Sequence, residues 1–338
     1  MSRKVIVLGA GISGLSTAAY LAKLGFKVEI LEKYSIPGGR ARKLEAEGFI
    51  FDMGASWYGL PNVYEKFFND FNYHTSDFFK LVQLNPGYRI FFDKDEIIDV
   101  PSEKEQLFNL FESIEKGSSK KLKSLLQKAG ERQLLAVKRG FQRQNFLQIE
   151  FLKEMVTYLK PAEFQSDIVG EKFNDKRLRS ILKLPGLFMG AIPDKNTHPY
   201  NFVGFANFGP GSWYPEGGLF KVLEAIEKIC YEQGVEISYQ VNVDQFDVMK
   251  QRISAAHSGH RNFYADYFVS TADYNFTDQK LIQDKYRNYS QNFWNKKSIT
   301  SSTLIFYLGL NKKIPNFLHN NLPVIAFPLL FEATISTF

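Results

Sequence analysis

Hydrophobic and polar positions in the first forty residues follow the pattern of a β-α-β unit. The continuous apolar run at residues 5–8 is typical of a parallel strand that is buried on both faces. Apolar residues then recur at helical spacing over residues 12–24, and Gly25 is expected to end this helix. A second apolar run at residues 27–32 predicts the next strand of the same sheet.

The pattern changes after residue 101, where apolar residues recur at intervals of three and four. Leu107, Leu110, Phe111 and Ile114 follow this spacing, which predicts amphipathic helices within residues 102–183. The rest of the chain predicts, in order, a helix at 219–233, a strand at 235–239, an antiparallel meander at 240–248, 253–257 and 263–269, and a strand at 302–309.

Composition places the 338 residues among ordinary globular proteins, with 44% hydrophobic, 15% aromatic and 23% charged residues. These values exclude collagen, coiled coils and wholesale disorder. No apolar stretch reaches the roughly 18–20 residues that a membrane-spanning helix needs. The single cysteine, Cys230, excludes an intramolecular disulfide and fits a reducing cytosol without proving one.

The net charge of +6, from 42 Lys and Arg against 36 Asp and Glu, is modest for this length. A nucleic-acid-binding protein usually shows a larger, clustered excess, so we expect no nucleic-acid partner. Residues 102–183 contain 17 Lys and Arg against 11 Asp and Glu, which equals the whole surplus. Basic amphipathic helices bind anionic lipid surfaces, but a solvated helical face explains the same charge equally well.

A glycine-rich turn lies between the first predicted strand and the first helix. Gly9, Gly11 and Gly14 form the G-x-G-x-x-G pattern in this context, with Ser13 inside the turn. The three glycines allow a tight turn, close approach to a pyrophosphate and close helix–strand packing, respectively. Glu32 ends the second strand eighteen residues after Gly14, where an acid accepts hydrogen bonds from ribose hydroxyls. The sequence therefore predicts a dinucleotide site.

A second glycine pair, Gly38 and Gly39, follows Glu32 and precedes Arg40. NAD and FAD share the first motif, so the choice between them depends on this second loop. Two amide-rich loops and an arginine near the phosphates or the ribityl chain favour a large, buried dinucleotide, and we therefore predict FAD. The alternative is that Arg40 and Arg42 are solvated surface cations.

With these motifs, the chain resembles the FAD-dependent amine oxidase superfamily and, within it, the bacterial-type phytoene desaturases. The resemblance is collinear from about residue 4 to residue 320, and the motifs after Asp175 are those that point to carotenoid desaturases. The segments that carry it are the first glycine loop with Glu32, 38–42, 51–58, 175–178, 184–190, 213–218, 270–273 and 307–310.

The resemblance implies an α/β fold: a Rossmann-type FAD-binding domain with a mixed-sheet substrate domain and a helical insertion. It places Gly54, Ala55 and Ser56 beside the isoalloxazine ring. It also places the backbone of Val243 against adenine, although a plain β-core valine is nearly as good an interpretation. The implied domains are 1–75 with 215–275 for FAD, 76–101 with 196–214 and 276–338 for substrate, and 102–195 for a helical, membrane-facing part.

The implied activity is FAD-dependent desaturation of a long apolar polyene such as phytoene in carotenoid biosynthesis. Such an enzyme is an oxidoreductase that acts on CH–CH groups. Asp175 and Arg179, four residues apart on a predicted helix, are candidates for proton handling, although an ordinary salt bridge is the preferred interpretation. The five histidines show no metal-ligand spacing, so no metal is expected.

Family members typically continue to a glycine-rich segment that closes over the flavin, and nothing after His319 matches it. We therefore expect a chain that is truncated at its C-terminus. The alternatives left open are a carotene isomerase or saturase, an amine oxidase, and an inactive fragment. The expected location is the cytoplasm. The sequence leaves open whether the protein also attaches peripherally to the inner face of the membrane. It does not determine an oligomeric state.

Overall fold

The computed structural model divides into two compact units. Unit 1 contains Met1–Ser56, Glu65–Lys80 and Pro215–Ile299, and unit 2 contains Trp57–Tyr64, Leu81–Tyr214 and Thr300–Phe338. The structure describes residues 2–54, 58–92, 96–140, 168–188, 208–297, 304–312, 322–325 and 330–333. The three predicted domains and their boundaries stay a prediction.

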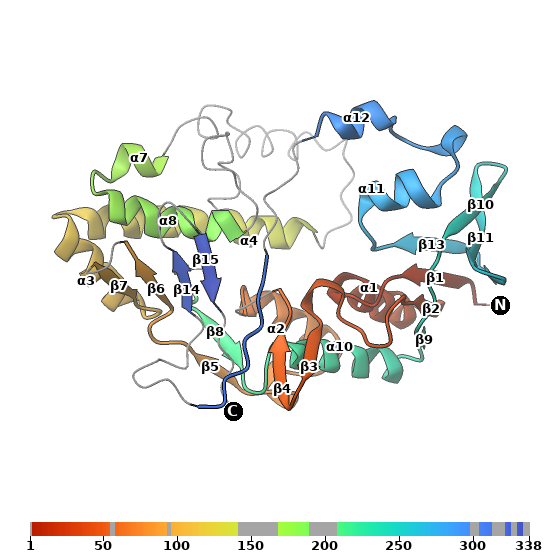
Figure 1. Ribbon diagram of the computed structural model, residues 1–338, viewed down its shortest axis with the longest axis horizontal. Helices are drawn as coiled ribbons and strands as arrows, with labels where there is room; N and C mark the ends of the chain where they lie inside the picture. The colour runs from red at the N-terminus through yellow and green to blue at the C-terminus, as the bar shows by residue number, and fades with distance from the viewer. Residues whose placement is uncertain are drawn as a thin grey trace. The chain divides into compact units, whose positions relative to one another are not determined.

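Unit 1 is built on a four-stranded parallel sheet with the strand order β13-β1-β2-β9 (Figure 1). Helix α1 packs against β1, β2 and α10, and this arrangement confirms the predicted α/β class. The bounds are Lys4–Leu8 for β1, Ile12–Lys23 for α1, Lys27–Leu31 for β2, Phe220–Glu232 for α10, Glu236–Ser238 for β9 and Tyr267–Ser270 for β13.

The apolar run of β1 is continuous because both faces of the strand are covered. Ile6 and Leu8 belong to a buried cluster with Val243 and Phe246. Successive side chains of a strand point to opposite faces, so Val7 is buried on the other face. Burial on both faces fixes the register of β1 between its two parallel neighbours.

The predicted meander is confirmed in part. Strands β10 (Gln245–Met249), β11 (Arg252–Ser258) and β12 (Arg261–Tyr264) form an antiparallel sheet. The expected third strand at 263–269 is wrong as a single element, because β12 ends at Tyr264 and β13 pairs in parallel with β1. Alternation along a strand indicates which face is buried, and it does not indicate which sheet the strand joins.

The remaining elements of unit 1 are short. Strands β3 and β4 form an antiparallel pair, and a run of short helices follows β13 (Figure 1). Helix α2 (Pro61–Asp70) contains the boundary between the units at residue 65. The bounds are Gly39–Ala41 for a 3₁₀ turn, Lys43–Ala46 for β3, Phe49–Asp52 for β4, Thr75–Asp77 for a second turn, Tyr274–Phe276 for α11, Thr277–Leu281 for a π-helical turn, Asp284–Tyr286 for a third turn and Gln291–Asn295 for α12.

Unit 2 combines helices with three strand pairs: β5 with β8, β6 with β7, and β14 with β15. The bounds of the strands are Leu81–Gln83, Tyr88–Phe91 and Ile97–Val100 for β5 to β7, Trp213–Pro215 for β8, Leu322–Ile325 for β14 and Leu330–Ala333 for β15. The bounds of the helices are Lys104–Ile114 for α3, Ser118–Gly140 for α4, Ile168–Lys172 for α7 and Lys176–Phe188 for α8.

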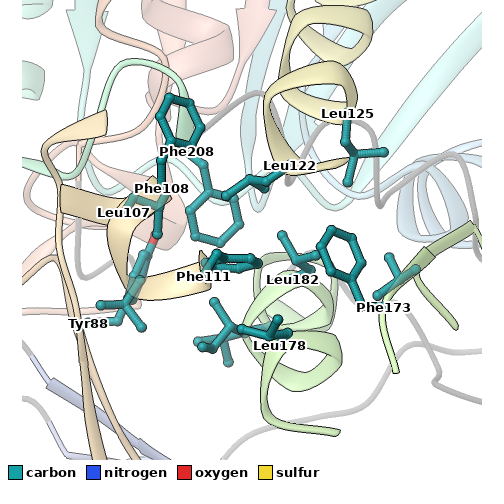
Figure 2. Close-up of a cluster of buried hydrophobic side chains, with 14 of the residues drawn as sticks. Tyr88, Leu107, Phe108, Phe111, Leu122, Leu125, Phe173, Leu178, Leu182 and Phe208 are labelled. Carbon is teal, nitrogen blue, oxygen red and sulfur yellow. The ribbon is translucent and has the colours of Figure 1, made fainter. Parts of the chain in front are cut away.

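The core of unit 2 lies where these helices meet (Figure 2). Phe111 from α3 and Phe173 beside α8 are both fully buried, with ring centroids 5.9 Å apart. Leu122 from α4 and Leu178 from α8 complete the contact. The three- and four-residue spacing therefore predicted α3 correctly. Residues 141–167 of the same predicted helical region lie outside the described residues.

The strand predicted at 302–309 is wrong over its described part. Residues 304–310 have no regular secondary structure, and Leu304, Phe306 and Leu308 are largely exposed. An apolar run favours a strand only where a neighbouring strand accepts its backbone hydrogen bonds, and sequence pattern does not supply that neighbour. Each helix in the described part of the chain is either too short or too polar to span a bilayer.

Candidate functional site

The first glycine loop is packed so tightly that two of its positions admit only glycine. A Cβ atom at Gly14 would lie 1.8 Å from the carbonyl oxygen of Gly9. Gly9 itself has a φ of 95°, a conformation that side chains rarely adopt, and its N–H donates to Leu31 O at 2.9 Å. The loop therefore connects β1 to α1 at van der Waals contact and anchors α1 to the sheet.

Helix α1 begins directly after this loop and has no capping side chain. Gly11 is its N-cap residue and makes no side-chain hydrogen bond, and the first turn contains no acidic residue. Ser13 is exposed on that turn. The first N–H groups of a helix have no partner within the helix and carry a partial positive charge, so this end suits an anion.

The second glycine loop lies against the first. Gly38 and Gly11 form a parallel β-bridge, and Gly38 N–H donates to Ala10 O at 2.8 Å. A Cβ atom at Gly39 would lie 3.3 Å from the Cα of Gly11. The two loops that the sequence predicted separately are thus brought into direct backbone contact in unit 1.

Glu32 is buried, with 4% of its surface exposed, at the end of β2. Its Oε2 accepts a hydrogen bond from Ala10 N–H at 2.6 Å, and its Oε1 accepts one from Tyr34 N–H at 2.9 Å. The carboxylate is therefore held against the first glycine loop by two backbone donors. Each carboxylate oxygen can accept more than one hydrogen bond, so the group retains capacity for a ligand hydroxyl.

The segment after β4 contacts the second glycine loop. Gly54 has a φ of 99°, and a Cβ atom there would lie 2.5 Å from Arg40 O. The side chain of Arg40 is exposed. Ala55 and Ser56, which were predicted beside the flavin ring, lie outside the described residues. The predicted roles of Arg40 and Gly54 stay predictions.

Val243 is buried, with 7% of its surface exposed, and its side chain packs in the cluster that contains Leu8 and Leu31. This packing agrees with the interpretation as a β-core valine. The predicted contact of its backbone with adenine stays a prediction. The neighbouring Val241 N–H donates to Glu32 O at 2.8 Å, so this segment runs beside the end of β2.

The two candidates for proton handling lie in unit 2 and are bonded to other groups. Asp175 Oδ2 is 2.6 Å from Arg177 Nη2, and these hydrogen bonds hold the pKa of Asp175 below its usual value. Arg177 also pairs with Glu96 at 2.9 Å. Arg179 Nε donates to Phe173 O at 2.6 Å. Asp175 thus forms its ion pair with Arg177 instead of the predicted Arg179, because the side chain at i+2 reaches back over the start of α8.

Two residues of the site were not singled out from the sequence. Thr271, after β13, donates from Oγ1 to Leu8 O at 2.7 Å, and that hydroxyl lies 2.9 Å from where a Gly14 Cβ would be. Asp52, at the end of β4, accepts N–H hydrogen bonds from Leu219 at 2.8 Å and Phe220 at 3.2 Å and so caps α10. Both lie in motifs quoted above, but a motif does not indicate which distant element it contacts.

Comparison with known proteins decides the family. Residues 12–293 match the sequence model of the family described as flavin containing amine oxidoreductase. The chain belongs to this family. Within the described residues, no group of three or more His, Cys, Asp or Glu side chains is arranged to hold a metal ion.

Carotenoid desaturases are among the curated relatives of this chain. A carotenoid 3,4-desaturase from Haloarcula japonica is 30% identical over 94% of this chain and 65% of its own length. A zeta-carotene-forming phytoene desaturase from Myxococcus xanthus is 28% identical over 94% of this chain and 62% of its own length. These matches confirm the resemblance to phytoene desaturases. The chain spans less than two thirds of the length of either relative.

Solved structures agree on the fold. The crystal structure of a CLA-producing fatty acid isomerase from P. acnes matches with a TM-score of 0.54 and 16% identity, over 85% of this chain and 63% of that one. This similarity, with the family membership, confirms the predicted fold, and the family confirms the predicted flavin cofactor, FAD.

The residues present fit a flavin dinucleotide. The uncapped start of α1 suits its pyrophosphate, and the buried carboxylate of Glu32 suits a ribose hydroxyl. The close contact of Gly11 with Gly39 leaves backbone, rather than side chains, to face a ligand at this point.

Proposed function

We propose that the chain is an FAD-dependent oxidoreductase that acts on CH–CH groups and desaturates a long apolar polyene such as phytoene. The observation that carries the proposal is the contact of the two glycine loops, through Gly11 and Gly38, beside the buried Glu32. The names of the curated relatives support the substrate class.

In this proposal the residues of unit 1 bind and orient the cofactor. The free N–H groups at the start of α1 bind the pyrophosphate, and Glu32 accepts a hydrogen bond from a ribose hydroxyl. Arg40 supplies a positive charge. The chemistry that FAD supplies when bound is acceptance of a hydride from the substrate. The tight packing around Gly14 excludes water from beneath the glycine loop and keeps its N–H groups fixed.

Titration of the purified 338-residue chain with FAD tests the cofactor site. We expect flavin fluorescence to change with saturable binding, and Glu32→Ala to weaken the binding about tenfold because a buried acceptor is lost. Glu236→Gln, on the exposed end of β9, is the matched control and should bind as the wild type does.

Anaerobic addition of phytoene in liposomes tests the reaction. We expect the flavin absorbance to bleach as the cofactor is reduced, with a desaturated polyene as the product. Binding of FAD without reduction by phytoene would contradict the desaturase while retaining the flavin site. A colourless chain that does not bind added FAD would contradict both.

We further propose that the protein attaches peripherally to the inner face of the membrane through a basic surface on unit 2. The lysines at 116, 120, 123 and 128 are exposed. On α4, Lys120 and Lys123 lie away from the face that buries Leu122, Leu125 and Ala129, and Lys128 lies at the edge of that face. A basic face of this kind is attracted to anionic headgroups, and the predicted substrate dissolves in lipid.

Co-sedimentation with anionic vesicles at low and high salt tests this attachment. Replacing the four lysines by glutamine should abolish most of the salt-sensitive binding. The control replaces four exposed lysines of unit 1 by glutamine, namely Lys27, Lys80, Lys228 and Lys250. Equal loss of binding in both variants would contradict a localised surface.

A further inference from the structure

A cationic aromatic group lies next to Glu32 and has no role in the function proposed above. The guanidinium carbon of Arg42 is 4.2 Å from the centroid of the Tyr34 ring, and the amine of Lys33 is 4.7 Å from it. Hydrogen bonding and positive charge from Arg42 and Lys33 hold the pKa of Tyr34 below its usual value. The three side chains therefore form one positively charged cluster.

The backbone ties this cluster to both glycine loops. Tyr34 N–H donates to Glu32 Oε1 at 2.9 Å, and the same carboxylate bonds the first loop at Ala10. At the other end, the Cα of Arg42 lies 2.6 Å from where a Gly38 Cβ would be. The contact between Arg42 and Tyr34 therefore joins the two ends of residues 34–42, the segment in which Gly38 bridges to the first loop.

The stacked arginine retains its ability to bind an anion. A guanidinium over an aromatic ring is attracted through its face, and its N–H donors point outward in its plane. Such donors form charge-assisted hydrogen bonds with phosphate oxygens, often in pairs. The nearby Glu32 carboxylate already accepts hydrogen bonds from two backbone N–H groups.

We propose that Arg42, positioned by Tyr34, is a second phosphate-binding cation of the dinucleotide site. It would bind phosphate in addition to the free N–H groups of α1. The inference rests on the proposed function for the site itself, and it concerns the diphosphate portion of the ligand. Tyr34 is a positioning residue, because its ring fixes where the guanidinium lies. The affinity for adenosine, which has no phosphate, should not change when either residue is replaced.

Calorimetric binding of ADP and of adenosine to the 338-residue chain tests the proposal. We expect Arg42→Gln to weaken ADP binding about tenfold and adenosine binding less than about twofold, because one charge-assisted contact is lost. Tyr34→Leu should weaken ADP binding to the same extent, and the double variant should be no weaker. Tyr34→Phe keeps the aromatic face and should bind ADP within about twofold of wild type.

Arg261→Gln is the matched control, because Arg261 also stacks on a ring, that of Phe263, but on β12. It should leave both ligands unaffected, and thermal unfolding confirms that each variant is folded. Equal weakening of ADP and adenosine by Arg42→Gln would overturn the phosphate role. Unchanged ADP binding in Tyr34→Leu would overturn the positioning role. A wild-type chain that binds neither ligand would contradict the dinucleotide site as well.

Discussion

At Gly14 the cost of a single methyl group can be stated from the structure. A Cβ atom there would overlap the carbonyl oxygen of Gly9 at 1.8 Å and approach the Thr271 hydroxyl at 2.9 Å. Because the first overlap is with backbone, rotation of a side chain does not relieve it. Either α1 or the end of β1 must move, and both carry the proposed pyrophosphate site.

We therefore expect Gly14→Ala to lower the free energy of unfolding by about 3 kcal/mol or more and to abolish FAD binding. Gly130→Ala is the control, because Gly130 lies in α4 with open space around it. That substitution should stabilise the chain by about 0.5–1 kcal/mol. Urea unfolding measures both effects, and a Gly14→Ala chain as stable as wild type would contradict the packing.

His257 is a second residue whose effect can be derived from its neighbours. Its Nε2 lies 2.8 Å from Asp247 Oδ2, and its Nδ1 lies 2.7 Å from Asn262 Oδ1. The hydrogen bond to Asp247, with that to Asn262 and the charge of Asp244, raises the pKa of His257 above its usual value. The folded state therefore favours the charged imidazole.

The stabilisation is fully present below the unfolded pKa of about 6.5 and is lost as pH rises through the folded pKa. We expect His257→Gln to be less stable than wild type by about 0.5 kcal/mol at pH 5.5, because surface ion pairs contribute little. The difference should shrink toward pH 9 in urea titrations. Asp247→Asn should lower the stability at pH 5.5 by the same amount, and its effect should also shrink toward pH 9. A loss of stability that does not depend on pH would refute the ion pair.

Among the elements, α10 depends on a strand far away in the sequence. Its first N–H groups donate to Asp52 at the end of β4. Gly218 packs against the same carboxylate, because a Cβ atom at Gly218 would lie 3.3 Å from Asp52 Oδ1. A capping carboxylate accepts hydrogen bonds from otherwise unpaired donors, and its negative charge interacts favourably with the positive end of the helix dipole. Helix α10 in turn packs against α1.

We expect Asp52→Ala to destabilise the chain by about 1–2 kcal/mol and to weaken FAD binding, because α10 supports α1. The matched control is Glu103→Ala, which removes the carboxylate that caps α3 in unit 2. That variant should be less stable than wild type, because two N–H groups of α3 lose their acceptor, and it should bind FAD as wild type does. Equal FAD affinity in both variants would contradict the support that α10 gives to the site.

For the molecule as a whole, the residues of the proposed dinucleotide site all belong to unit 1. The loops, the acid and the arginines come from residues 9–54. The elements β9, β13 and α10, which contact β2, β1 and α1, come from residues 215–299. Unit 2 has its own core of side chains from its helices and from β6 and β7, and it includes Phe111 and Phe173. A ligand that binds unit 1 should therefore stabilise the units to different extents.

Hydrogen exchange with and without FAD measures this difference. At a hundred times its Kd, a ligand stabilises the element it binds by about 2.7 kcal/mol. We expect slower exchange in peptides that cover β1, α1 and β2, with peptides from α3 as the internal reference. No slowing in the first set at saturating FAD would show that the glycine loops do not hold the cofactor.

The sequence by itself determined the β-α-β unit, its glycine loop and Glu32. Each depends on neighbouring residues, and the glycine spacing reflects steric limits that act within a few residues. The same holds for α3, where apolar spacing indicated the buried face correctly.

Only the tertiary structure decided which distant elements meet. Asp52 contacts a helix that begins 168 residues later, and β13 joins β1 across most of the chain. Periodicity reports which face of an element is buried and not what covers it. The entropic cost of closing a loop also grows slowly with its length, so sequence separation does not favour one partner strongly over another. Arg42 on Tyr34 is the same case at short range, because no pattern indicates which ring a cation covers.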